Sequence, residues 1–168
     1  MSEICILYCL TKREMTIYSV KKFITNLFGA FTRASHGTIH PSLKKLLAEN
    51  CVTVRDMLSE GGKKSSYYSI TEKGKKYLTE LLLSDLSDNP SVLTNEINIR
   101  LSAISHLNKE NKEILIQNAI RALDLQTVNI EKMLNDKYAN YDENQTAVMK
   151  QRQKQIADYM AFLKDFKV

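Results

Sequence analysis

Apolar residues recur at helical spacing through the first part of the chain. One face of residues 16–28, "TIYSVKKFITNLF", carries Ile17, Val20, Ile24, Leu27 and Phe28. Thr16 can cap this helix, and Gly29 is a natural place for it to end. The apolar segment before it predicts a shorter helix over residues 3–12.

A third helix is predicted within "SHGTIHPSLKKLLAENCV", residues 35–52. Ser35 can cap it and Asn50 can end it. Its inner face would hold Ile39, Leu43, Leu46 and Leu47. Small and polar residues gather at its start, which core packing does not require. This arrangement is typical of a helix that presents its first turns to something outside the protein.

The hydrophobic period then changes to that of strands. Residues 51–58, "CVTVRDML", and residues 66–70, "SYYSI", alternate and are rich in β-branched and aromatic side chains. The segment between them, "SEGGKKS", predicts a flexible, basic turn. Thr71 can cap a fourth helix after the second strand. The order helix, helix, helix, strand, strand, helix is that of a winged helix-turn-helix.

Beyond a linker at residues 84–91 the pattern is helical, with neither Gly nor Pro after it. A fifth helix is marked by Ile97, Leu101 and Ile104. Two longer helices follow, separated by residues 135–144. Each carries a stripe of apolar residues at heptad-like spacing, which we call its seam. Seams of this length usually pair with a second copy of the chain, although they could instead cover the chain's own first domain. The expected dimerisation residues are Ile116, Ile120, Leu123, Ile130, Leu134, Ile156, Tyr159 and Leu163.

We therefore predict a mostly α protein with a small β-hairpin and two domains. Residues 1–84 would form a winged helix-turn-helix DNA-binding domain. Residues 91–168 would form a helical, coiled-coil-like dimerisation and effector domain. A chain of 168 residues is long enough for two small domains.

The charge distribution supports this division. Of the net charge of +5, all lies in residues 1–86, which hold 13 Lys and Arg against 8 Asp and Glu, whereas residues 87–168 hold 11 of each. A basic half beside a neutral half suggests a module that binds a polyanion. In a winged helix-turn-helix, the third helix enters the DNA major groove and the hairpin lies against phosphates.

The candidate DNA-binding residues lie on this third helix and in the hairpin turn. Hydroxyl and ammonium groups can contact base edges or phosphates, and a glycine allows close approach of the backbone. Pro41 is placed near the first turn, where a missing N–H is tolerated. The candidates are Ser35, Gly37, Thr38, His40, Pro41, Lys44, Lys45, Lys63 and Lys64.

Three segments resemble the PadR family of transcriptional regulators. "GTIHPSLKKLLAENCV" is similar to the family signature G-T-I-Y-P-x-L-x-x-L-x-x-x-G-L-V, and "MTIYSVKKFI" resembles the segment before it. "GGKKSSYYSITEKGKKYL" resembles the family's wing, with Tyr67 and Tyr68 in its second strand. The resemblance adds Tyr18 to the DNA-reading residues. It covers most of residues 4–83.

The resemblance implies a dimeric, cytoplasmic repressor of the winged-helix class. Its partners would be double-stranded DNA with a near-palindromic operator and, as effector, a small aromatic or cationic compound. This sequence departs from the signature at His40, where the family has Tyr, and at Asn50, where Gly is usual. It also lacks the tryptophan that stacks planar ligands in some relatives, which weakens any transfer of effector identity. Late aromatics could line an effector pocket: Tyr138, Tyr141, Tyr159, Phe162 and Phe166.

Other functions have less support in the sequence. No nucleophile–base motif, phosphate-binding glycine loop or zinc hydrolase motif is present, so we predict neither an enzyme nor a cofactor or metal site. The apolar runs are too short to span a membrane. Two alternatives stay open. The basic surface could bind RNA or an acidic protein, or Cys5, Cys9 and Cys51 could make the regulator respond to thiol oxidation or a metal.

Overall fold

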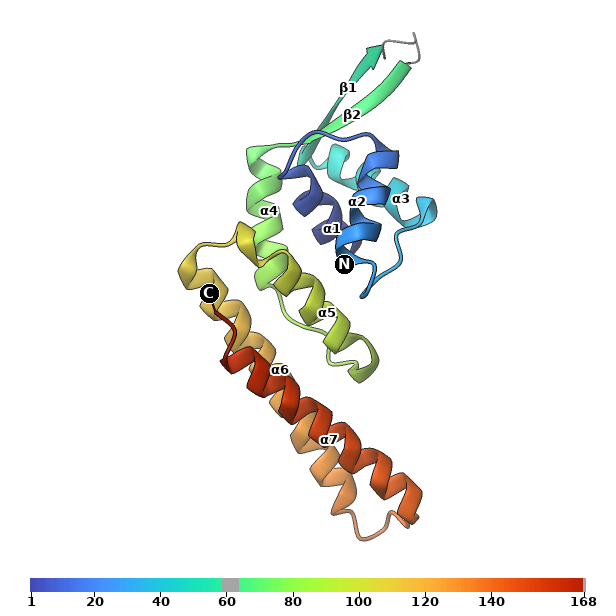
Figure 1. Cartoon of the computed structure of the whole chain (residues 1–168), viewed down its shortest axis with the longest axis vertical. Helices are drawn as coiled ribbons and strands as arrows, with labels where there is room; N and C mark the ends of the chain where they lie inside the picture. Colours follow the sequence, from blue (N-terminus) through green and yellow to red (C-terminus); the bar gives the residue numbers. More distant parts are fainter. Residues whose placement is uncertain (59–63, 168) are drawn as a thin grey trace.

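The computed structural model describes residues 1–58 and 64–167. The N-terminal helices are α1 (Ser2–Leu10), α2 (Ile17–Phe28) and α3 (His36–Ala48), and the hairpin is β1 (Val52–Leu58) and β2 (Lys64–Ile70). The later helices are α4 (Glu72–Leu83), α5 (Pro90–Ser102), the 3-10 turn η1 (Ile104–His106), α6 (Lys109–Leu134) and α7 (Glu143–Lys164). The hairpin and the α6–α7 pair lie at opposite ends of the long axis (Figure 1). The predicted mostly α fold with a small hairpin is confirmed.

The helix boundaries follow from local capping chemistry. Thr16 accepts a hydrogen bond from the Ser19 amide at 3.2 Å, and Thr71 accepts one from the Gly74 amide at 3.0 Å. Such caps contribute about 1 kcal/mol each to helix stability. Asn50 follows α3 with a φ of 57°, the left-handed conformation that Asn tolerates better than most residues.

Helix α1 lies at the centre of the N-terminal part. Every residue from Ile4 to Leu10 is buried, because α2, α3 and α4 surround it. The Tyr8 ring meets Phe28 edge to face, with ring centroids 6.0 Å apart, and its hydroxyl lies 2.8 Å from the Ser105 hydroxyl. A helix that is apolar all round is stable in water only when it is covered in this way.

Helix α5 is apolar on two sides, and each side belongs to a different core. Ile99 joins the core around α1, and Ala103, Leu107 and Leu115 extend that core beyond α5. Leu93, Ile97 and Leu101 belong to a second core. The division into domains at 1–84 and 91–168 stays a prediction, and the first core extends well past residue 84.

The two predicted seams meet each other within one chain. Ile116 and Leu123 of α6 share the second core with Ile156 and Leu163 of α7, and Ile120, Ile130 and Tyr159 pack against it half-buried. Leu134 is half-buried at the far end. The seam spacing identified the buried faces, and within one chain α5 and the two helices themselves cover them. The dimerisation role of these residues stays a prediction. Across the described residues, no helix combines the length and apolar character that crossing a bilayer needs.

All three cysteines are buried. Burial raises the pKa of Cys5 and of Cys9 to about 12 and also raises the pKa of Cys51. Thiols in this state are protonated at neutral pH and react slowly. Within residues 1–58 and 64–167, no group of three His, Cys, Asp or Glu is placed to hold a metal ion. The placement of the thiols therefore gives no support to the thiol- or metal-responsive alternative.

The start of α4 depends on a close approach of backbones at Gly74. A Cβ at Gly74 would lie 2.0 Å from the Cys51 carbonyl oxygen and 2.8 Å from Cγ1 of Ile70. We expect Gly74→Ala to lower the free energy of unfolding by about 1–3 kcal/mol, because α4 must move away from the hairpin base. Urea unfolding followed by circular dichroism measures this. Gly37→Ala is the matched control: its Cβ would meet only the Ser35 hydroxyl at 3.8 Å, so its stability should equal or exceed the wild type's.

The thiols of the folded protein should resist alkylation. We expect Cys5, Cys9 and Cys51 to remain unmodified by iodoacetamide at neutral pH, because burial keeps them protonated and covered. In denaturant all three should react. Intact-mass spectrometry over time measures both reactions. Rapid modification of the folded protein at any of the three would contradict this expectation.

Candidate nucleic-acid interface

The outer face of α3 is the main candidate surface. Ile39, Leu43 and Leu46 are buried on its inner side. Since a helix turns by 100° per residue, Gly37, Pro41 and Lys44 lie on the opposite side, and all three are exposed. His40 is exposed beside them. The predicted reading residues therefore line one accessible side of the helix.

Ser35 and Thr38 hold the first turn of α3 in a capping box. The Ser35 hydroxyl accepts from the Thr38 amide at 3.2 Å, and the Thr38 hydroxyl accepts from the Ser35 amide at 3.3 Å. The Thr38 hydroxyl also donates to the Ser35 carbonyl at 3.0 Å. These contacts engage both hydroxyls in setting the helix start. The first-turn amides of a helix have no intrahelical acceptor and favour an anion such as phosphate.

Pro41 lies deeper in the helix than the sequence suggested. It is the sixth residue of α3, in the second turn, and not in the first. A proline has no N–H, so the Gly37 carbonyl loses the donor that the helix would normally provide four residues later. Gly37 and Pro41 are both exposed, and this carbonyl lies on the same side as Lys44.

The two lysines of α3 differ in their surroundings. Lys44 lies on the outer face, whereas Lys45 turns toward α1, where its ammonium is 2.9 Å from the Glu3 carboxylate. The Tyr77 hydroxyl of α4 donates to the same carboxylate at 2.8 Å. The hydrogen bond to Glu3 raises the pKa of Lys45. Lys45 thus joins three helices, a contact that the sequence did not reveal because Glu3 is far away along the chain.

The hairpin is anchored at its base and charged further out. Val52 and Tyr68 are buried, and the Tyr68 backbone pairs with Met15 through hydrogen bonds of 2.9 and 3.0 Å. Lys64 forms an ion pair with Asp56 at 2.9 Å. The hydrogen bond from Lys64, with a second from the Ser66 hydroxyl, holds the pKa of Asp56 below its usual value. Lys63 and the predicted Gly61–Gly62 turn lie outside the described residues.

Arg55 is a hairpin cation that the sequence interpretation missed. It lies opposite Tyr67 on the outer face of β1 and forms an ion pair with Glu14. The alternation of side chains along β1 could have revealed Arg55. Because Val52 points inward, Thr53 and Arg55 point outward. Tyr18, at the first turn of α2, is 71% exposed, an unusual position for an aromatic side chain without an external contact.

These features lie at one end of the molecule. Helices α2 and α3 and the hairpin lie around α1, away from the α6–α7 pair, and β1 packs directly against α3 (Figure 1). An exposed helix face beside a charged hairpin can read base edges while contacting the neighbouring phosphates. Of the two hairpin tyrosines, Tyr68 serves the structure, because it is buried against the core, whereas Tyr67 is half-buried opposite Arg55.

Comparisons with known proteins agree with this interpretation. Residues 6–80 match the model of the transcriptional regulator PadR-like family. A curated relative, the negative transcriptional regulator PadR of Bacillus subtilis (strain 168), is 27% identical over 116 residues, which cover 69% of this chain and 63% of the relative.

Two similar solved structures cover nearly the whole chain. One is Bacillus subtilis PadR in complex with operator DNA, 20% identical, with a TM-score of 0.48 over 97% of this chain and 94% of that one. The other is a Streptococcus mutans UA159 protein, 25% identical, with a TM-score of 0.47 over 97% and 96%. The likeness to a family is carried by residues 6–80, which match the model of the transcriptional regulator PadR-like family.

Proposed function

We propose that this protein regulates transcription by binding double-stranded DNA through the outer face of α3. The observation that carries the proposal is that α3 exposes Gly37, His40, Pro41 and Lys44 on one side, next to the hairpin. A helix of this kind fits the major groove, where its first turns meet base edges. The family consists of transcriptional regulators and not of enzymes.

The other predicted DNA-binding residues take supporting parts in this proposal. Ser35 and Thr38 fix the start of the reading helix, and Tyr18 and Lys64 face the phosphates. Lys45 orients α3 through Glu3 and does not reach the DNA, because its charge is already paired on the α1 side. The Arg55–Glu14 and Lys64–Asp56 pairs moderate the positive charge of the hairpin.

The active form in this proposal is a homodimer on a near-palindromic operator. Two reading helices in a dimer must lie about 34 Å apart, one turn of DNA. The seams are covered within the chain, so the surface for a second copy is the exposed stripe of α6. Ile114, Leu125 and Val128 lie on that stripe, and Leu125 is 61% exposed.

We further propose that the protein represses transcription and that a small aromatic effector relieves this repression. The Bacillus subtilis relative is a negative transcriptional regulator, which supports repression. Tyr141 lines a depression of about 490 Å³ together with Leu134, Glu131 and Lys150, which is large enough for an aromatic ring. To relieve repression, a ligand must bind one arrangement of the dimer better than the other.

The test is fluorescence anisotropy with duplex DNA from upstream of the gene, across a salt series, against random duplex and duplex RNA. Saturable binding that prefers the upstream DNA is expected. Equal binding to all duplex DNA would leave only an electrostatic interaction and contradict operator recognition. A preference for the RNA would support the alternative of an RNA-binding winged helix.

Lys44 and Lys45 form a matched pair of variants in this assay. Lys44→Ala should weaken binding by about 1–3 kcal/mol if the lysine contacts a guanine, or reduce the salt slope by about one if it contacts a phosphate. Lys45→Ala should leave the salt slope unchanged, because its ammonium is held by Glu3. Equal losses of slope in both variants would show that both lysines reach the DNA.

Removing the Asp56 carboxylate should strengthen binding without changing sequence preference. The pKa of Asp56 is below its usual value, so the carboxylate is charged at neutral pH and occupies Lys64. In Asp56→Asn, Lys64 becomes available to a phosphate, and the slope of log K against log salt should steepen by up to about one. Asp158→Asn, at an exposed carboxylate of α7, is the control. A slope that matches the control would place Lys64 away from the DNA.

A further inference from the structure

A buried ion pair lies where the winged-helix part joins the arm. Arg100 of α5 is only 3% exposed, and its guanidinium is 2.6 Å from the Glu96 carboxylate one turn earlier. The same guanidinium donates to the Leu82 carbonyl at 3.2 Å, the Asp85 carbonyl at 3.0 Å and the Ser84 hydroxyl at 3.2 Å, and also to the Ser84 carbonyl. Arg100 therefore holds the end of α4 from within α5.

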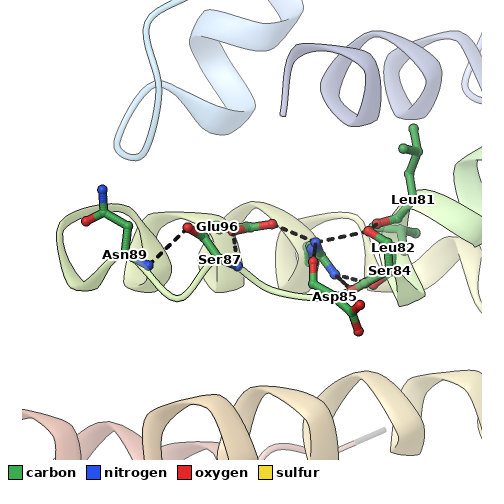
Figure 2. Close-up of polar contacts among 8 residues, drawn as sticks. Leu81, Leu82, Ser84, Asp85, Ser87, Asn89 and Glu96 are labelled. Atoms are coloured by element: carbon green, nitrogen blue, oxygen red, sulfur yellow. Dashed lines mark hydrogen bonds and ion pairs between the residues drawn. The ribbon is translucent and has the colours of Figure 1, made fainter. Parts of the chain in front are cut away.

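Glu96 extends this contact along the rest of the connection. Its second carboxylate oxygen accepts from the Ser87 amide at 3.0 Å, and the Ser87 hydroxyl accepts from the Asn89 amide at 3.2 Å. Figure 2 shows Glu96 between Ser87 and the end of α4 at Ser84 and Asp85. One ion pair thus fixes the connection from residue 82 to residue 89.

Stability alone does not account for a pair in this position. Taking both charges out of water is costly, and apolar residues of similar volume often serve stability equally well. The Nε of Arg100 is also buried without a hydrogen-bond partner among the described residues. What the planar guanidinium provides is geometry, because it directs several donors in fixed directions toward the backbone of one turn.

We propose that Arg100, paired with Glu96, is a positioning residue that sets the angle between α3 and the arm, and thereby selects the half-site spacing that the protein accepts on DNA. This inference rests on the proposed DNA-binding function. In a dimer joined through α6, the reading helix of each copy is carried at the end of a lever that turns at this connection. Helix α6 has 26 residues. It is therefore about 39 Å long.

A small change of angle is enough to matter. In a symmetric dimer the same rotation occurs in both copies, so a change of angle at this connection moves both reading helices and changes their separation twice over. Hydrogen bonds also hold η1 against the N-terminal part, from Tyr8 to Ser105 at 2.8 Å and from His106 to the Lys75 carbonyl at 3.0 Å and the Thr79 hydroxyl at 3.2 Å. These contacts do not involve residues 84–89, so the position of that turn depends on the Arg100–Glu96 pair.

The first test compares the full-length wild type with Arg100→Lys, which keeps the charge and loses the planar fork. Duplexes carrying two half-sites at spacings that differ by single base pairs are titrated by anisotropy, together with a single half-site. The wild type should prefer one spacing at least about tenfold. Arg100→Lys should bind the single half-site as the wild type does, while its preference among spacings falls to about threefold or less.

A second measurement needs no DNA. Spin labels at Asn26→Cys in α2 and Tyr138→Cys at the arm tip, in protein diluted with unlabelled copies, report the angle as a distance distribution within one copy. Arg100→Lys should broaden or shift this distribution. Lys154→Arg, at an exposed lysine of α7, should change neither readout.

The outcomes separate the two proposals. If Arg100→Lys matches the wild type in both distance distribution and spacing preference, the role of Arg100 is overturned. If the wild type shows no preference for any spacing over random DNA, the proposed function fails, and the distance measurement still decides whether Arg100 positions the arm. If Arg100→Lys does not fold by circular dichroism, Glu96→Gln takes its place, because it keeps the side-chain shape and one acceptor oxygen but removes the charge pair and the second acceptor.

Discussion

The burial of α1 on every side is the constraint on which the rest of the molecule depends. Seven consecutive side chains, Ile4–Leu10, are removed from water, and a fully buried aliphatic side chain contributes about 1.5–3 kcal/mol. No single partner can cover a helix completely, so α2, α3, α4 and β2 must surround it. Because the apolar face of α3 must pack against α1, the opposite face of α3 is exposed.

Features set by local chemistry could be predicted from the sequence. The caps at Thr16, Ser35 and Thr71 depend on residues three positions away, and the left-handed Asn50 on the side chain itself. The period of apolar residues identified the helices and the inner side of α3. The family resemblance carried by residues 37–52 is confirmed by the match over residues 6–80.

Features set by distant partners could not be predicted. The seam spacing of α6 and α7 shows which faces are buried but not what covers them. Lys45 is drawn to Glu3, 42 residues away, and nothing in the local pattern indicates it. The Glu96–Arg100 pair has the spacing of an ordinary surface contact, and only the packing of α5 between two cores makes it buried. The prediction placed Pro41 near the first turn of the helix. Since the helix begins directly after Ser35, Pro41 is in the second turn.

The two apolar sides of α5 have a consequence for how the chain unfolds. Ile99, with Ala103 beyond it, closes the core around α1, while Leu93 and Ile97 close the core of the arm. Neither core can open without exposing apolar surface on the helix that they share. The chain should therefore lose both parts in one cooperative transition. A fragment cut at the linker would leave an uncovered hydrophobic face, so the winged helix depends on its arm for solubility as well as for position.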